Sequence, residues 1–166
     1  MTTASATGSI WRFAVRLRKD LRDAEAEGLK ADALDLGVRG VERISVSRVY
    51  YLRGDLQLSE PNKIASELLT DPIAEECDIR EVNPQSESRG SRSKGTHTIE
   101  VAYRPGVRDP VEDSVLKGAA DLGIEGIRAV HTAKEYGIDG TLNAEALTRL
   151  TDKLLVNATI QQVVTP

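Results

Sequence analysis

Cysteine, aromatic residues and long apolar runs are scarce in this chain of 166 residues. Cys77 is the single cysteine, which excludes an internal disulfide and a cysteine cage for a metal ion. Aromatic residues make up only 4% of the chain, so we expect a core of Val, Ile, Leu and Ala. No segment approaches the roughly 18 apolar residues of a membrane span, and the N-terminal MTTASATGS lacks the parts of a signal peptide. We therefore expect a cytoplasmic protein.

The charge balance narrows the class of partner. The formal net charge is −4, which argues against a general nucleic-acid or membrane-surface binder. The run RGSRSK at 89–94 is basic but has no interleaved aromatic residues, so we interpret it as part of a linker rather than an RNA-binding segment.

Motifs for catalysis are also missing. Cys77 lies in EECDI, where the adjacent carboxylates are expected to raise its pKa and make it a poor nucleophile. His97 and His131 have no Cys or Glu at ligand spacing, and the sequence has no glycine-rich phosphate loop. We expect no catalytic, cofactor-binding or metal site in this chain.

The clearest local pattern begins with an expected strand at 98–104. Ile99, Val101 and Tyr103 alternate with more polar residues, as in a half-buried strand. Pro105 and Gly106 then predict a turn.

A helix is expected at 110–122. Asp109 is a favourable N-cap, Pro110 suits the first helical position, and Glu112 completes a capping box. Gly123 predicts the helix end. Helix capping thus explains these acidic residues better than a pair of catalytic carboxylates does.

The same order of elements is expected twice. In the first half we predict a strand at 10–17, a helix at about 21–36, β-structure at 41–52, a helix opened by Ser59 and a strand at 73–82. The helix at 21–36 is expected to bury Leu29, Ala33 and Leu36, and the next helix Ile64, Ala65, Leu68 and Leu69. After the polar, Ser- and Gly-rich segment 83–97, the second half repeats this with a strand at 98–104, a helix at 110–122, β-structure at 127–138, a helix at 143–155 and a strand at 159–164.

A shift of about 86 residues aligns the halves without a gap. Tyr50 then falls on Tyr136, Asp23 on Asp109, and Leu36-Gly37 on Leu122-Gly123. We predict an α+β fold of two tandem β-α-β-β-α-β units forming an intrachain pseudo-dimer. The predicted division is a flexible tail at 1–9, repeat 1 at 10–82, a flexible linker at 83–97 and repeat 2 at 98–166.

One basic residue interrupts the apolar phase of each central β segment. It is Arg48 in the first half and Lys134 at the aligned position of the second. Two interpretations stay open: an interface across the pseudo-twofold axis, or a bulge or snorkelling stem that turns the side chain outward.

The stretch RPGVRDPVEDSVLKGAADLGIEGI resembles PurS, the small subunit of phosphoribosylformylglycinamidine synthase, in its order of strand, Pro-Gly, Asp-Pro, helix and Leu-Gly. The later LLVNATIQQV is similar to the C-terminal pattern of that family, with Ala158 where proline is usual. The first half resembles the family more weakly, because Lys19-Asp20 replaces Pro-Gly. The tandem form is similar to the front of large synthases.

The resemblance implies an accessory role in purine biosynthesis. The implied partners are synthetase (PurL-like) and glutaminase (PurQ-like) subunits, which would use ATP, Mg and glutamine, with this chain bridging them for ammonia transfer. A second copy of the chain is a further candidate partner. The residues expected at a partner interface are Arg104, Pro105, Gly106, Arg108, Asp109, Arg48 and Lys134. The alternative is a small-molecule-sensing regulatory module, since duplicated α/β units can bind effectors at their interface. A third hypothesis is an enzyme with an unrecognised site.

Overall fold

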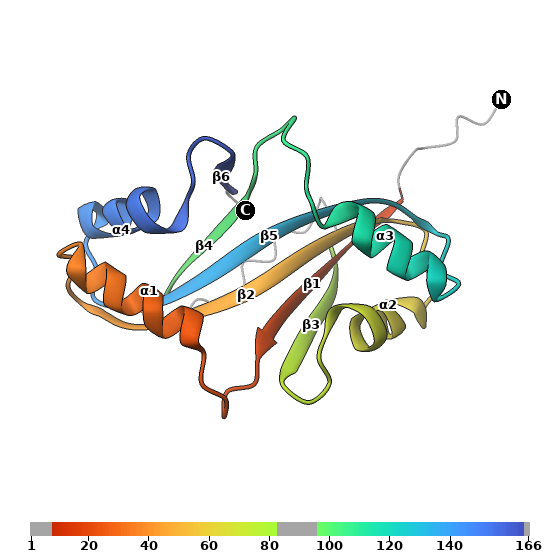
Figure 1. Ribbon diagram of the computed structural model, residues 1–166, viewed down its shortest axis with the longest axis horizontal. Coiled ribbons are helices and arrows are strands. Elements are labelled where there is room, and N and C mark those ends of the chain that lie inside the picture. Colours follow the sequence, from red (N-terminus) through yellow and green to blue (C-terminus); the bar gives the residue numbers. More distant parts are fainter. Residues whose placement is uncertain (1–7, 83–95, 165–166) are drawn as a thin grey trace.

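The computed structural model describes residues 8–82 and 96–164. Within them, six strands form one antiparallel sheet in the order β3-β1-β2-β5-β4-β6, which confirms the mixed α+β class (Figure 1). The strands are β1 (Ser9–Leu17), β2 (Val41–Gly54), β3 (Glu75–Val82), β4 (Thr96–Tyr103), β5 (Ile127–Gly140) and β6 (Gln161–Val164). The helices are α1 (Ala24–Asp35), α2 (Glu60–Ile64) with its π-helical continuation η1 (Ala65–Leu69), α3 (Glu112–Asp121), and α4 (Ala144–Leu150) with its continuation η2 (Thr151–Leu155).

The expected β-α-β-β-α-β order was wrong, because each half is β-α-β-α-β. The sequence 41–54 has no turn residue before Gly54, so β2 runs unbroken for 14 residues, and β5 does the same. These two long strands pair with each other at the centre of the sheet. The halves are therefore joined edge to edge in one sheet.

Two hydrophobic clusters lie on the same face of this sheet, and each draws on both halves. In Figure 1, α1 and α4 lie over one end of the sheet and α2 and α3 over the other. The first cluster packs α2, η1 and α3 on β1 and parts of β2 and β5; its buried members are Phe13, Val15, Tyr50, Leu52, Ile64, Ala65, Leu69, Val115, Ala119, Ile124 and Val130. The second packs α1, α4 and η2 on the rest of that face; its buried members are Ala26, Ala33, Val38, Ile44, Val46, Ile99, Val101, Tyr136, Ile138, Leu150 and Leu155.

The helices largely follow the sequence prediction, with corrections at their ends. Asp23 is the N-cap of α1 and its carboxylate accepts a bond from the Ala26 N–H at 2.9 Å, so the helix begins at Ala24 rather than near residue 21. Leu36 is 37% exposed and does not join the core, because it follows the last turn of α1. Ile64, Ala65 and Leu69 are buried as expected.

Most of the predicted tail and linker lies outside the described residues. Thr96 and His97, placed in the linker by the sequence, begin β4 instead, and Ser9 begins β1. The division into repeats at 10–82 and 98–166 stays a prediction.

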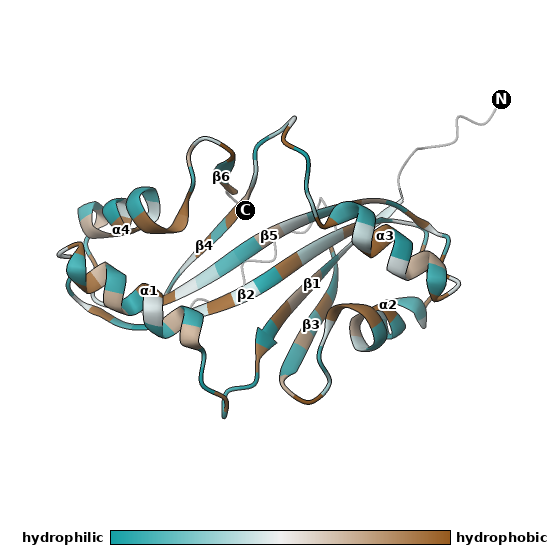
Figure 2. Ribbon diagram, in the orientation of Figure 1, coloured by the Kyte–Doolittle hydropathy of each residue, from teal (hydrophilic) through white to brown (hydrophobic). Residues whose placement is uncertain are grey.

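The strands alternate in polarity, visible as bands of colour in Figure 2. The face away from the helices is mainly polar and has a small apolar centre of Ala14, Val49 and Ala133. No helix in the described part of the chain is long and apolar enough to cross a membrane.

Candidate interaction surface around the central strands

Arg48 and Lys134 lie directly opposite each other in the ladder between β2 and β5. They are also the residues that the 86-residue shift places at equivalent positions. The strand order outward from the centre is also the same in both halves, so an approximate twofold axis of the sheet passes between Arg48 and Lys134. The pairing runs without a register shift from Arg43 to Arg53, so a bulge does not explain the two basic residues.

Each of these cations has an acidic neighbour from the first half. Arg48 donates to the Glu75 carboxylate at 2.6 Å, and Lys134 donates to the Glu25 carboxylate at 2.6 Å. Burial acts to lower the pKa of Lys134, but its hydrogen bond and charge interaction with Glu25 raise it overall. The Arg48 and Lys134 side chains remain 47% and 46% exposed, so solvent screens both ion pairs.

A small hollow of about 190 Å³ opens beside these two cations. Its lining includes Arg48, Lys134, Tyr103, Val111 and Thr132, from β2, β5, β4 and the start of α3. A depression of this size accommodates a side chain of a partner or a small ligand better than a nucleotide.

The turn after β4 borders the same region. The Arg104 carbonyl accepts a bond from the Val107 N–H at 3.0 Å, and Gly106 has φ +86°, which with Pro105 makes a type II turn. Arg104, Pro105 and Gly106 are exposed. The backbone N–H and the Nε–H of Arg104 donate to the carbonyls of Ile160 and Gln161, so β6 and its preceding loop hold the turn in place.

Asp109 was expected to be the N-cap of a helix starting at Pro110, and this was wrong. Helix α3 begins at Glu112 with Val111 as its N-cap residue. Asp109 is only 6% exposed, and its carboxylate accepts bonds from the Val111 N–H at 3.0 Å and from the Thr132 N–H and hydroxyl at 2.6 and 2.8 Å. Asp109 therefore anchors the turn to β5, while the neighbouring Arg108 stays exposed and pairs with Asp113.

The first half repeats several of these contacts at a distance of 86 residues. The Arg18 N–H donates to the Ala74 carbonyl at 3.0 Å, as that of Arg104 does to Ile160. Arg22 pairs with Glu27 at 2.7 Å, as Arg108 does with Asp113. The two turns thus share a framework and differ in their exposed residues.

The sequence did not predict a charged network that lies on the face of the sheet away from the helices. The Arg12 side chain, 4% exposed, contacts Glu135 at 2.5 Å and Glu100 at 3.2 Å. Its Nε–H donates to the Tyr51 hydroxyl at 3.2 Å, and that hydroxyl donates to Glu100 at 2.6 Å. Burial and the bond to Glu100 raise the pKa of Tyr51 to about 12. The alternation of β1 placed Arg12 on this face, but no sequence pattern indicated that it would be buried.

The remaining candidates carry little chemistry. Burial, with a smaller contribution from Asp78, raises the pKa of Cys77, in the direction that the sequence predicted. Within residues 8–82 and 96–164, no group of three or more His, Cys, Asp or Glu side chains could hold a metal ion.

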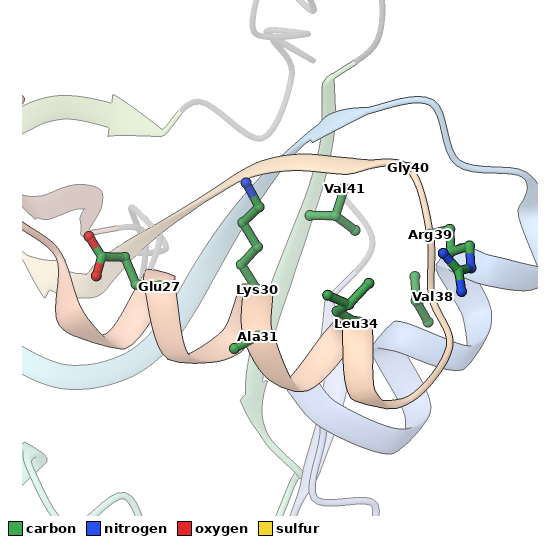
Figure 3. A pocket seen from close by; sticks show the side chains of 8 residues that line it. All are labelled: Glu27, Lys30, Ala31, Leu34, Val38, Arg39, Gly40 and Val41. Atoms are coloured by element: carbon green, nitrogen blue, oxygen red, sulfur yellow. The ribbon is translucent and has the colours of Figure 1, made fainter.

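A larger hollow of about 480 Å³ lies between α1 and the segment 38–41 (Figure 3). Lys30, which lines it, already donates to the Glu42 carbonyl at 2.6 Å.

The second half is a complete β-α-β-α-β unit with a charged, anchored turn between its first strand and first helix. Residues 96–165 match the family model described as PurS: Phosphoribosylformylglycinamidine (FGAM) synthase. The second half of the chain therefore matches the PurS family, as the sequence resemblance implied. The match covers one such unit and does not include the first half. No curated protein matches the chain.

Proposed function

We propose that this chain is a non-catalytic accessory subunit of the phosphoribosylformylglycinamidine synthase complex, where it bridges the synthetase and glutaminase subunits and supports ammonia transfer. The family match over residues 96–165 carries the proposal, since it includes the turn 104–107 and the Asp109 anchor. In this assembly ATP, Mg and glutamine would be used by the partner subunits in the cytoplasm, and the chain itself would hold no cofactor.

We further propose that the first half is a second, diverged PurS-like unit produced by tandem duplication. The repeated element order and the turn contacts shared at an 86-residue offset support this. The halves differ at the turn, where Pro105-Gly106 corresponds to Lys19-Asp20. The turn of the second half is accordingly the proposed partner-contacting one, together with Arg48 and Lys134.

The decisive experiment is reconstitution with the synthetase and glutaminase proteins of the same cell. The three proteins are expected to co-purify. Omitting this chain should abolish the glutamine-dependent synthase rate and leave the ammonia-dependent rate intact. Failure to bind either protein, or equal glutamine-dependent rates with and without the chain, would contradict the proposal.

The regulatory alternative gives a different result in a simpler assay. A small-molecule sensor should show a saturable thermal shift with one metabolite in a screen of amino acids and nucleotides, and an amino acid is the class that fits the hollow beside Arg48 and Lys134. Substituting both cations with alanine should then remove the shift, whereas R104A/R108A, which changes the turn alone, should leave it unchanged.

A further inference from the structure

The four members of the buried network on the face away from the helices are divided between the halves, and the two carboxylates come from the same half. Arg12 and Tyr51 belong to the first half, whereas Glu100 and Glu135 belong to the second. Glu100 and Glu135 lie directly opposite each other in the ladder between β4 and β5. Two carboxylates at that spacing repel each other, so the guanidinium of Arg12 neutralises a repulsion internal to the second half.

The aligned positions of the opposite halves hold no charged residue and no tyrosine. An 86-residue shift places Thr98 at the position of Arg12 and Gly137 at that of Tyr51. Ala14 stands at the position of Glu100, and Val49 at that of Glu135. The network therefore exists once in the pair of halves, and the twofold axis does not reproduce it.

This asymmetry determines what would happen if like halves paired through the same central strands. Two second halves would each keep the opposed Glu100 and Glu135, with Thr98 of the other copy where Arg12 now lies. Two first halves would each bury Arg12 against Ala14 and Val49 of the other copy. Both arrangements leave charges without the partner they have now, and such buried charges are strongly unfavourable.

The helix-bearing face adds an independent penalty against pairing two second halves. The acids beside Arg48 and Lys134, Glu75 and Glu25, both come from the first half. Their equivalents in the second half are Gln161 and Val111. Two second halves would consequently place Lys134 opposite Lys134 with uncharged side chains in both acid positions.

We propose that these contacts select the pairing of unlike halves, so that a first half pairs with a second half and like halves are rejected. Repulsive and attractive contacts both contribute to this selectivity. Every assembled pair then presents one turn of each kind, namely one 18–23 turn and one 104–109 turn. A pair of identical units would instead present two equal turns. The inference rests on the register and side-chain contacts, and it holds whether or not the chain bridges a synthase.

The test uses disulfide trapping in the full chain. In a pair of second halves, position 134 would lie opposite itself, at the Cα separation of about 5 Å that suits a disulfide. A C77S/K134C background chain is unfolded in urea, refolded at high concentration and oxidised, and the disulfide-linked dimer is measured by non-reducing electrophoresis. We expect little linked dimer, and about a fivefold or greater rise when E100A and E135V are added, because these remove the repulsion between like halves.

The control is R43A in the same background. Arg43 pairs with Asp139 across the same central strands, but it is 73% exposed, so its loss should leave the yield unchanged. E100Q/E135Q, which keeps side-chain size, replaces E100A/E135V if that variant does not refold. A high yield in the background chain, or a yield that neither pair of substitutions raises, overturns the proposal.

Discussion

Arg48 and Lys134 face each other across the twofold axis of the sheet, and an acid from the first half accompanies each of them. Two cations in directly opposed strand positions repel. Glu75 and Glu25 offset that repulsion. The stability of the paired central strands therefore depends on acidic residues that lie outside those strands.

The first prediction concerns these two acids. The E25Q/E75Q variant should lose about 0.5–1 kcal/mol of unfolding free energy, because it exposes the repulsion between the two cations while both remain half-exposed. Urea denaturation at low salt measures the loss, and high salt should reduce it. E27Q, which removes the exposed acid paired with Arg22 on the same helix, is the control and should show a smaller loss. Equal losses in the two variants would contradict the prediction.

Arg12 should be far more important for stability. R12M leaves Glu100 and Glu135 opposed in a mostly buried site, and we expect a loss of about 3–5 kcal/mol in the unfolding free energy. R12K should recover only part of it, because an ammonium group cannot reproduce the three contacts of the guanidinium. A loss for R12M no larger than that for R43A would show that the network contributes little.

Tyr51 should make stability fall at high pH. Its pKa is raised to about 12 in the folded state, above its ordinary value of 10, so the folded protein keeps this proton more tightly than the unfolded chain does. The resulting stabilisation is complete below pH 10 and is lost as the pH rises from 10 to about 12. Unfolding free energies measured across this range should fall less steeply for Y51F than for the unchanged protein. Identical slopes would exclude Tyr51 as the cause.

The two aligned aspartates should differ in their contribution to stability. D23A removes an N-cap contact and should cost about 1 kcal/mol. D109A leaves the Thr132 N–H without its acceptor in a buried site and should cost about 2–3 kcal/mol. T132V isolates the contribution of the hydroxyl, which accounts for one of the three bonds to Asp109. Chemical denaturation of the three variants is the measurement, and a larger loss for D23A than for D109A would contradict the assigned roles.

Partner binding should depend on the turn of the second half. R104A/R108A is expected to weaken binding to the synthase subunits by about tenfold. R18A/R22A is a closely matched control, because Arg18 and Arg22 make the corresponding backbone and ion-pair contacts in the first half. Affinities from surface-based binding assays, with circular dichroism to verify folding, separate the two cases. Equal weakening in both variants would remove the proposed division of roles between the halves.

The sequence predicted most elements because their signals are local. Alternation predicted the strands, Gly37 and Gly123 lie just after helices α1 and α3, and the spacing of Ile64, Ala65 and Leu69 predicted a buried face. The 86-residue shift also placed Arg48 and Lys134 at equivalent positions. It did not show that they would meet, because the pairing of β2 with β5 is a property of the assembled sheet.

The predictions failed at residues whose contacts are distant in the sequence. Asp109 has the spacing of an N-cap, yet its carboxylate bonds to Thr132, 23 residues later in the chain. Arg12 has the ordinary appearance of an exposed strand arginine, and only its approach to Glu135 from a distant strand explains its burial. Tertiary contacts overrode local preference at both positions.

The mixed composition of the two cores has a consequence for synthesis in the cell. When the ribosome has released only the first half, α1 has emerged without α4, and α2 without α3, so each core is incomplete. Stable packing must wait until β5 is available to pair with β2, a contact between residues far apart in sequence. The nascent first half therefore exposes apolar sheet surface during translation and is the stage at which a chaperone would bind.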